Sequence, residues 1–315
     1  MIEFIRSEFD HVIDAHGGRK GVFAKPKEWH VAETGEWSST IDGDKLYQRR
    51  AREALPLLVR QAEAARTIGY NELALELGMP NPRNLNYVLG AIGNTLGELS
   101  KSWREGISPI QCLVINKNTG LPGEGVGWFL NIPEDFKGLL RARQREIIDG
   151  KLQDIFGYTR WRDVLDALGL SYPPPNFAEA NRKAAAFGGG DSEDHKALKA
   201  FIAANPTVLV LPRSTPSGQQ EDPLPSGDFL DVSFRIGKTW VAAEVKSARS
   251  ADADITRGIY QCVKYLAVMR AVQTSDDEDR SARVVLVLEG SLPAWLIPLK
   301  NQLGVEVVEC ARSRA

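Results

Sequence analysis

Cysteine and histidine are scarce in this chain of 315 residues, which contains three cysteines and four histidines. The cysteines (Cys112, Cys262 and Cys310) are odd in number and widely spaced, so they form neither a zinc-binding pattern nor a disulfide framework. This usage is typical of a reducing compartment, and we expect a cytoplasmic protein. With so few and such scattered histidines, a histidine-rich metal site is not expected.

The sequence also lacks a long apolar run and a strong net charge. No apolar segment approaches the roughly 20 residues that a membrane-spanning helix requires. Residues 1–14 alternate charged and apolar side chains, unlike a signal peptide, so we expect no membrane association. The net charge of −2 excludes a general attraction to nucleic acid, and a DNA-binding surface would have to be a local patch.

Length and composition indicate two domains. The chain is 43% hydrophobic and 25% charged, which is ordinary for a soluble globular protein with an ample core. The clearest linker lies within residues 171–192, which carry a proline run at one end and a glycine run at the other. We predict an N-terminal domain over residues 1–175, a linker over 176–192 and a C-terminal domain over 193–315.

A segment of the C-terminal domain, residues 227–247, has the pattern of a β-hairpin. Residues 229–236 and 239–246 alternate in side-chain character on either side of a two-residue turn. Gly237 stands first in that turn, which indicates type II′ geometry and a fixed register between the strands.

In this register Asp231 lies opposite Glu244 and shares a face with Glu244 and Lys246, while the other face is apolar. Two carboxylates this close resist joint ionisation unless a cation lies between them. Their hard oxygen ligands suit Mg²⁺ or Mn²⁺. The lysine would orient or help deprotonate an attacking water, or neutralise charge on a phosphate. The alternative is an ordinary salt bridge on an exposed face.

The pattern Asp231…Glu244-x-Lys246 resembles the motif of the PD-(D/E)XK nuclease superfamily, which has the restriction-endonuclease-like fold. The resemblance covers residues 191–310. It implies that Asp231 and Glu244 bind Mg²⁺ and that Lys246 assists water attack on a phosphodiester. Leu230 stands where the superfamily motif has proline. Asp228 is a rival for the first acidic position, but the register places it on the apolar side.

A helix is predicted before the hairpin and ends before Pro206. Helices in this position often supply a further carboxylate in the superfamily, so Glu193 is a candidate metal ligand by resemblance. Compensation of the helix dipole is the alternative for this residue. His195 is expected to be a solvated helix residue.

A second helix is predicted after the hairpin, beginning near Asp254 or Thr256. Its Gln261-x-x-x-Tyr265 pair resembles a feature of RecB-like branches of the superfamily, in which the pair faces the active site or the DNA. Gln261 and Tyr265 are therefore candidate catalytic residues. The same helix offers two candidate nucleic-acid contacts, Arg257 and Lys264.

The remaining C-terminal elements are predicted as a strand over 283–289, a helix over 293–303 and a strand over 305–310. The order helix, three strands, helix, strand, helix, strand fits the mixed sheet flanked by helices of the superfamily. The predicted fold class is therefore α/β, with a restriction-endonuclease-like C-terminal domain.

The N-terminal domain is predicted to be α+β and winged-helix-like. Helical patterns cover residues 44–65, 70–78 and 84–103, and a strand over 107–116 leads into a glycine-rich hairpin, or wing, over 117–130. Further helices are predicted over 134–149 and 160–168. This arrangement is often used to grip DNA; a domain that contacts proteins is the alternative.

The Tyr-x-Glu-Leu-Ala phrase that begins at Tyr70, together with the helix pair and the glycine-rich loop, weakly resembles the DNA-binding domain of alkyltransferase-like proteins. The segment resembles the same domain of alkylguanine alkyltransferases, which carry a Pro-Cys-His-Arg nucleophile motif. Cys112 lacks the activating histidine here, so it is predicted to be a neutral, buried strand cysteine. Tyr70, Asn84 and Lys117 are candidate nucleic-acid contacts.

These features favour a Mg²⁺-dependent (or Mn²⁺-dependent) DNA endonuclease, with an N-terminal targeting domain and a role in restriction or phage defence. A homodimer is expected because cutting both strands requires two sites. Alternatives are a non-catalytic DNA-binding or effector protein on the same scaffold, a nuclease acting on RNA, and a nuclease of DNA repair.

Overall fold

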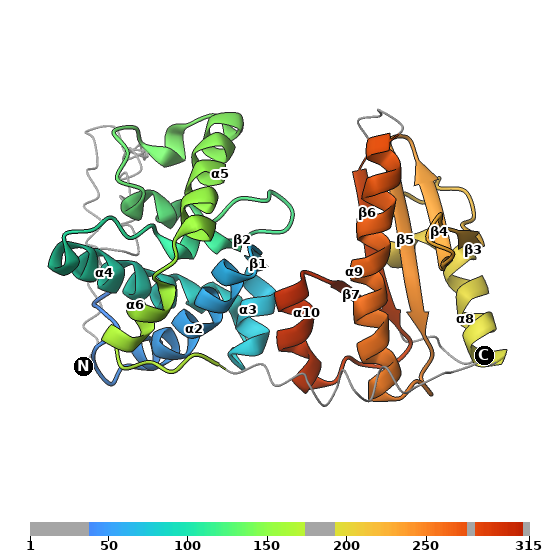
Figure 1. The fold of residues 1–315 in the computed structure, drawn as a ribbon, viewed down its shortest axis with the longest axis horizontal. Coiled ribbons are helices and arrows are strands. Elements are labelled where there is room, and N and C mark those ends of the chain that lie inside the picture. Colours follow the sequence, from blue (N-terminus) through green and yellow to red (C-terminus); the bar gives the residue numbers. More distant parts are fainter. Residues whose placement is uncertain (1–37, 174–192, 276–280, 311–315) are drawn as a thin grey trace, which may run out of the picture. The chain divides into compact units, whose positions relative to one another are not determined.

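The computed structural model describes residues 38–173, 193–275 and 281–310 (Figure 1). The buried apolar side chains fall into three clusters. One cluster contains residues between Ile41 and Leu165, and the other two contain residues between Leu198 and Val305. The predicted linker over 176–192 lies outside the described residues. No described helix is long and apolar enough to cross a membrane.

The C-terminal part contains a five-stranded mixed sheet with the order β3-β4-β5-β6-β7 (Figure 1). The strands are β3 (Gln219–Pro223), β4 (Phe229–Ile236), β5 (Thr239–Lys246), β6 (Ser281–Leu288) and β7 (Glu306–Glu309). β3, β4 and β5 pair antiparallel, whereas β5, β6 and β7 pair parallel. The predicted mixed sheet is confirmed.

The register of the β4–β5 hairpin is also confirmed near its turn. Ile236 pairs with Thr239, and Val232 pairs with Ala243. Gly237 has a φ of 54°, a conformation that costs glycine little and most other residues more. The turn residue therefore fixes which strand positions lie opposite each other.

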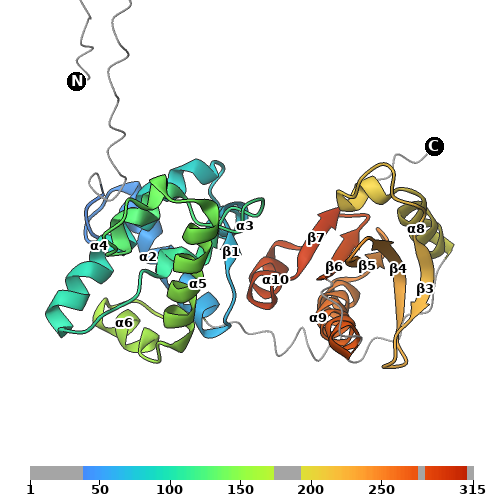
Figure 2. The same cartoon turned by 90° about the horizontal axis from the view of Figure 1, so that it is seen from above.

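Two helices, α8 (Glu193–Ala204) and α9 (Asp252–Ser275), cover opposite faces of this sheet (Figure 2). The α8 side contains Leu198, Ile202, Val232, Phe234, Val241, Ala243, Val245, Val285 and Val287. The α9 side contains Leu230, Trp240, Ala242, Ile259, Cys262, Tyr265, Met269, Leu286 and others. Both faces of the central strand β5 are buried, which accounts for its nearly continuous apolar sequence.

The parallel strands are joined by helices, because parallel pairing requires a crossover connection. α9 joins β5 to β6, and β6 is followed by the 3₁₀ helix η6 (Ala294–Leu296) and then α10 (Ile297–Leu303) before β7. A further 3₁₀ helix, η5 (Pro206–Leu209), follows α8. The predicted order of helices and strands in residues 193–310 is confirmed.

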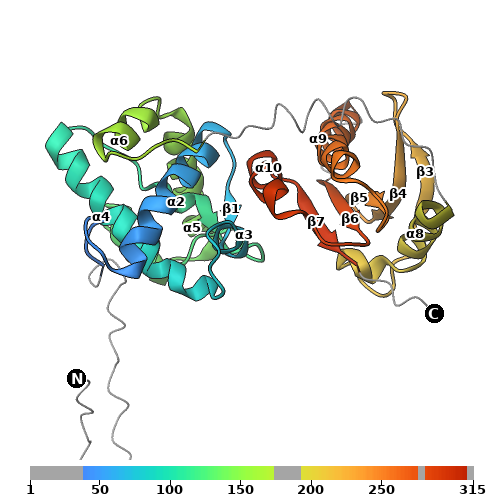
Figure 3. The ribbon, with the colours of Figure 1, turned by 90° about the horizontal axis from the view of Figure 1, so that it is seen from below.

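The N-terminal part is mainly helical (Figure 3). Its helices are α2 (Leu46–Glu63), α3 (Tyr70–Glu76), α4 (Leu85–Trp103), α5 (Arg141–Gly157) and α6 (Trp161–Ala167). Its 3₁₀ helices are η1 (Pro82–Asn84), η2 (Ile110–Leu113), η3 (Glu124–Phe129) and η4 (Phe136–Gly138). Two short strands, β1 (Ile68–Gly69) and β2 (Val114–Ile115), pair parallel. The three predicted helices over residues 44–103 are confirmed.

The predicted strand over 107–116 and the β-hairpin wing over 117–130 are not present as such. Only Val114–Ile115 is strand, and the glycine-rich loop is closed by a single bridge between Asn116 and Leu121 before it continues as η3. The Asn116 side chain accepts a hydrogen bond from the Asn118 N–H at 2.9 Å, which forms a tight turn in place of paired strands.

The helix predicted over 134–149 instead spans Arg141–Gly157. The Asp135 side chain accepts a hydrogen bond from the Lys137 N–H at 3.2 Å and caps the short helix η4. This capped turn occupies the first half of the predicted range, because aspartate bonds to nearby backbone more readily outside a long helix than inside one.

Candidate functional site

The candidate site lies where β4 separates from β5. The β4–β5 ladder ends at the Val232–Ala243 pair, and in a continued ladder Val245 would pair with Leu230. Instead, the Val245 N–H donates to Asp231 Oδ2 at 2.8 Å, and the Val245 carbonyl oxygen lies 2.8 Å from His195 Nε2. A carbonyl oxygen only accepts, so Nε2 carries the proton in this contact. Two side chains thus take the place of backbone pairing.

Asp231 and Glu244 do not share a face through regular pairing, because the β4–β5 ladder ends at Val232 and Ala243. Asp231 contacts α8, with Oδ1 3.5 Å from Lys199 Nζ and Oδ2 3.6 Å from His195 Nε2, and its charge also acts on Glu244 and on Tyr265 of α9. Glu244 lies on the α9 side, against Gly258.

A change of phase in β3 and β4 explains this placement. Gln220 pairs with Val232 and Asp222 pairs with Leu230, but the intervening position of β3, Glu221, has a φ of 50° and makes no regular pair. Leu230 consequently enters the α9-side cluster, although Val232 belongs to the α8-side cluster. Strict alternation, from which the shared face was predicted, breaks at Asp231.

Glu244 is only 3% exposed, yet it remains within the electrostatic influence of Asp231. Burial, followed by the negative charge of Asp231, raises the pKa of the Glu244 carboxyl to about 7. Lys246 and His195 act in the opposite direction. A cation or a proton beside Glu244 would therefore relieve an unfavourable concentration of negative charge.

Lys246 is buried and is bound by two carboxylates. Its Nζ lies 2.9 Å from Glu244 Oε1 and 3.1 Å from Asp254 Oδ1. Burial opposes the ammonium form, but the negative charges of Glu244 and Asp254 outweigh it, and the pKa of Lys246 is raised. The lysine is therefore held protonated at neutral pH.

Asp254 is a site residue that the sequence did not single out. It lies in the first turn of α9, one helical turn before Gly258. A Cβ atom at Gly258 would lie 2.9 Å from both Lys246 Cε and Leu286 Cδ1, so glycine lets α9 approach β5 at this point. The sequence signal that could have indicated Asp254 is an acidic residue four positions before a glycine in the interior of a helix.

Helix α8 contributes His195 and Lys199 to the site, while Glu193 lies apart from them. The Glu193 side chain is 90% exposed and pairs with Lys196 at 2.9 Å. The side chain of His195 is only 18% exposed and contacts the sheet, in contrast to its prediction as a solvated residue. His195 lies one turn before Lys199 and three residues before the buried Leu198, so helical spacing places it on the inner face.

Gln261 and Tyr265 lie together on α9, where Gln261 Nε2 donates to the Tyr265 hydroxyl at 3.1 Å. Tyr265 is 3% exposed, and burial, followed by the charge of Glu244, raises its pKa. Gln261 Oε1 is buried and has no hydrogen-bond partner in the structure. An unpaired acceptor of this kind is costly unless a ligand or water satisfies it.

The other α9 candidates lie towards the surface. Lys264 Nζ lies 2.7 Å from Asp228 Oδ1, and hydrogen bonds from Lys264 and Ser226 lower the pKa of Asp228. Asp228, the rival for the first acidic position, is thus engaged with Lys264. Arg257 is partly exposed in the first half of α9.

No three His, Cys, Asp or Glu side chains are grouped as a ready-made metal site among the described residues. Two carboxylates, Asp231 and Glu244, are nonetheless close enough for their charges to interact. Mg²⁺ is usually bound by one or two carboxylates together with water and substrate phosphates, so a complete protein cage is not required. The oxygen ligands of this pair fit a hard cation.

The N-terminal candidates do not form one cluster. The Tyr70 hydroxyl accepts a hydrogen bond from the Gly123 N–H at 2.9 Å, Asn84 is exposed at the end of η1, and Lys117 forms an ion pair with Glu72. Cys112 is fully buried in η2, and burial raises the pKa of its thiol to about 12. The prediction of a neutral, buried cysteine is confirmed, but Cys112 lies in a 3₁₀ helix and not in a strand.

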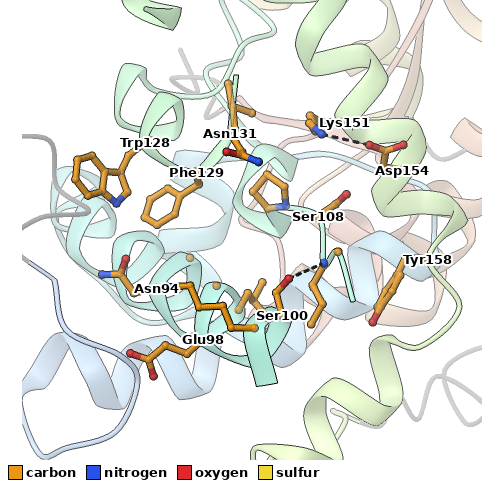
Figure 4. A pocket seen from close by; sticks show the side chains of 18 of the residues that line it. Asn94, Glu98, Ser100, Ser108, Trp128, Phe129, Asn131, Lys151, Asp154 and Tyr158 are labelled. Atoms are coloured by element: carbon orange, nitrogen blue, oxygen red, sulfur yellow. Dashed lines mark hydrogen bonds and ion pairs between the residues drawn. The ribbon is translucent and has the colours of Figure 1, made fainter. Parts of the chain in front are cut away.

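A separate groove of about 1400 Å³ lies between α4, η3 and α5 (Figure 4). Trp128, 48% exposed, and Phe129 line one side, and Asn94, Ser108 and Asn131 offer polar groups. None of Tyr70, Asn84 and Lys117 lines it. The sequence signal that was available was the aromatic pair at the end of the glycine-rich loop.

Comparisons with known proteins return no match to this chain. No family model, no curated protein and no solved structure is significantly similar to it. What the protein does has to be inferred from its own residues.

Proposed function

We propose that the protein is a metal-dependent nuclease that hydrolyses phosphodiester bonds in DNA, with a C-terminal domain of the PD-(D/E)XK type. The observation that carries this proposal is the position of Lys246, buried between Glu244 and Asp254 and close to the point where regular β4–β5 pairing ends at Asp231. A protonated lysine beside converging carboxylates suits a reaction in which negative charge grows on a phosphate.

Asp231 and Glu244 are the residues that would hold Mg²⁺ or Mn²⁺. When bound, such a cation activates water and polarises the phosphodiester. His195 adjoins Asp231 and fixes the backbone of Val245, so it would keep the two carboxylates in place. The unpaired Gln261 Oε1 offers a further acceptor for ordered water near Tyr265.

A lysine in such a site can either deprotonate the attacking water or stabilise negative charge in the transition state. Deprotonating water would require the neutral amine, but the two carboxylates raise the pKa of Lys246. Stabilising negative charge in the transition state requires the ammonium form that this arrangement favours. We therefore assign Lys246 to charge stabilisation.

We further propose that the N-terminal part targets the nuclease to DNA, in a role in restriction or phage defence. The groove beside Trp128 supports this proposal, because exposed aromatic rings stack on nucleic-acid bases and amide side chains bond to base edges. Replacing Trp128 with alanine should weaken DNA binding in a gel-shift assay while leaving Mg²⁺ binding unchanged. Cutting both strands would require two sites, so a homodimer is part of the proposal.

The decisive experiment compares Lys246→Ala with wild type on supercoiled plasmid DNA, in Mg²⁺ and in EDTA. Loss of the ammonium group should reduce cleavage by about 10²- to 10³-fold. Lys238→Ala removes an exposed lysine at the opposite end of the same hairpin and serves as the matched control. Equal cleavage by wild type and Lys246→Ala, or cleavage in EDTA, would contradict the proposal.

Three alternative functions have separate tests. A non-catalytic DNA-binding protein would bind no Mg²⁺ or Mn²⁺ in calorimetry, although its charged residues are present. A nuclease acting on RNA would cleave an RNA duplex faster than a DNA duplex of the same sequence. A repair nuclease would prefer damaged or branched DNA over intact plasmid.

A further inference from the structure

Lys199 is a buried lysine that neither the motif nor the proposed chemistry uses. It lies on α8 and is 4% exposed, comparable to the apolar residues around it. Removing an ammonium group from water is costly, so buried lysines are retained where they have charged partners. The partners of Lys199 therefore indicate what this residue does.

Two carboxylates at the change of phase in β3 and β4 are partners of Lys199. Its Nζ lies 3.5 Å from Asp231 Oδ1 and also forms an ion pair with Glu221. Glu221 is the residue with a φ of 50°, at the position where regular pairing with β4 is lost. One lysine thus joins α8 to the irregular point of both strands.

The Asp231 carboxylate is fixed at both of its oxygens. Oδ1 faces Lys199, and Oδ2 accepts the hydrogen bond from the Val245 N–H. A carboxylate oxygen has more than one lone pair, so each oxygen keeps capacity for another ligand. The rotation of this side chain is determined by the protein before any ligand binds.

We propose that Lys199 is a positioning residue that orients Asp231 for the reaction of the proposed active site. The inference rests on the proposed function and deepens it. Because the Lys199 side chain is only 5% exposed, it acts through Asp231 and does not touch the substrate. Groups that orient a metal ligand typically change activity or metal affinity by about 10- to 100-fold.

The test compares wild type, Lys199→Met and Lys199→Arg in steady-state cleavage of plasmid DNA with Mg²⁺. Lys199→Met should lower kcat by about 10- to 100-fold and leave KM within about threefold, and Lys199→Arg should restore most of kcat. Glu221→Gln is the matched control, because its side chain is 53% exposed and Asp231 would still hold Lys199. It should stay within about threefold of wild type.

Circular dichroism melts establish that each variant is folded at the assay temperature. If Lys199→Met is unfolded, Lys199→Gln takes its place under the same criteria. An unchanged kcat in the folded neutral variant would overturn the inference. Equal loss of kcat in Lys199→Arg and in the neutral variant would also overturn it, because the positive charge would then not matter.

Failure of the inference is distinguishable from failure of the proposed function. If wild type cleaves and a neutral Lys199 variant cleaves equally well, only the proposed role of Lys199 is contradicted. If wild type binds Mn²⁺ in calorimetry but cleaves no plasmid, Mn²⁺ affinity becomes the readout. An affinity that is about 10- to 100-fold weaker in Lys199→Met would then support the inference. Wild type that neither binds Mn²⁺ nor cleaves overturns both.

Discussion

The two ends of the β4–β5 hairpin are built on different principles. At the turn end, backbone groups pair in regular register, and Gly237 supplies the one unusual conformation that the turn requires. At the open end, the backbone of Val245 is bound by the side chains of Asp231 and His195. Regular pairing gives stability at one end, and its loss frees strand positions for charged groups at the other.

In a buried sheet, a ligand can reach charged groups only where regular backbone pairing ends. A strand paired on both sides has no backbone groups to offer and no room for a ligand. Where regular β4–β5 pairing ends, charged side chains gather in two adjacent groups. Those of α8 and β4 lie beside Val245, and those of β5 and α9 lie around Lys246. The comparison predicts that substitutions at the open end alter activity and that those at the turn end alter stability alone.

The largest expected effect is that of Asp231→Asn, which should reduce cleavage by about 10³-fold because a proposed metal ligand loses its charge. The amide oxygen can still accept the Val245 N–H, so the fold should be retained. Plasmid cleavage with Mg²⁺ and a thermal melt check both expectations.

Asp228→Asn is the matched control for this substitution, because Asp228 precedes the same strand but is bound to Lys264. It should cleave within about threefold of wild type. The reverse ranking of the two variants would move the first acidic position to Asp228.

Glu244→Gln should change how stability depends on pH. The pKa of Glu244 is about 7 in the folded protein against an ordinary value of 4.5, so protonation favours folding. The stabilisation by this proton is fully present below about pH 4.5 and is lost as the pH rises through about 7. Over this range the free energy of unfolding of wild type should fall by about 3 kcal/mol relative to that of the variant. Urea unfolding of both proteins across this range measures the difference.

Mg²⁺ should recover part of this stability in wild type above pH 7, because the cation takes the place of the proton, and should leave Glu244→Gln less affected. Parallel pH curves for the two proteins would show that Glu244 does not titrate in this range. The open end would then lack the electrostatic character that distinguishes it from the turn end.

His195→Ala should destabilise the protein by about 1–3 kcal/mol, because the part-buried Val245 carbonyl loses its donor. Cleavage should fall together with stability, since Asp231 lies beside the imidazole. Lys196→Ala, which removes an exposed ion pair with Glu193 on the same helix, should change stability by less than about 0.5 kcal/mol. Unfolding curves and cleavage assays on both variants provide the measurements.

Gly237→Ala should have the smallest effect, and it should lower stability without changing cleavage. An alanine at a φ of 54° costs about 1 kcal/mol, so the free energy of unfolding should fall by that amount. Cleavage by the folded variant should equal that of wild type. A loss of activity without a loss of stability would remove the distinction between the two ends of the hairpin.

The sequence predicted the regular parts of residues 193–310 well. Alternating side chains and a glycine-first turn are local signals, and they predicted the β4–β5 register and the order of elements. The same alternation failed at Asp231, because the phase change depends on the backbone of Glu221 in another strand. Nothing local to residues 229–236 reveals it.

Local sequence patterns also could not predict contacts between side chains of different helices and strands. His195 and Asp254 are separated from the motif by loops, and only packing of α8 and α9 on the sheet brings them to Val245 and Lys246. In the N-terminal part, the wing was predicted from glycine content, but an Asn116 turn and the 3₁₀ helix η3 form there. Glycine-rich segments permit many turns, and their composition does not select one.

The side-chain bonds to Val245 have a consequence for hydrogen exchange in the interior of the sheet. β5 lies between β4 and β6, and Asp231 and His195 satisfy the backbone groups of Val245 that no strand pairs. An amide whose hydrogen bond is lost exchanges with solvent at a lower opening free energy. A protein in which both residues are replaced by alanine should therefore exchange the Val245 amide hydrogen faster than wild type, while the amides near the Gly237 turn keep their protection.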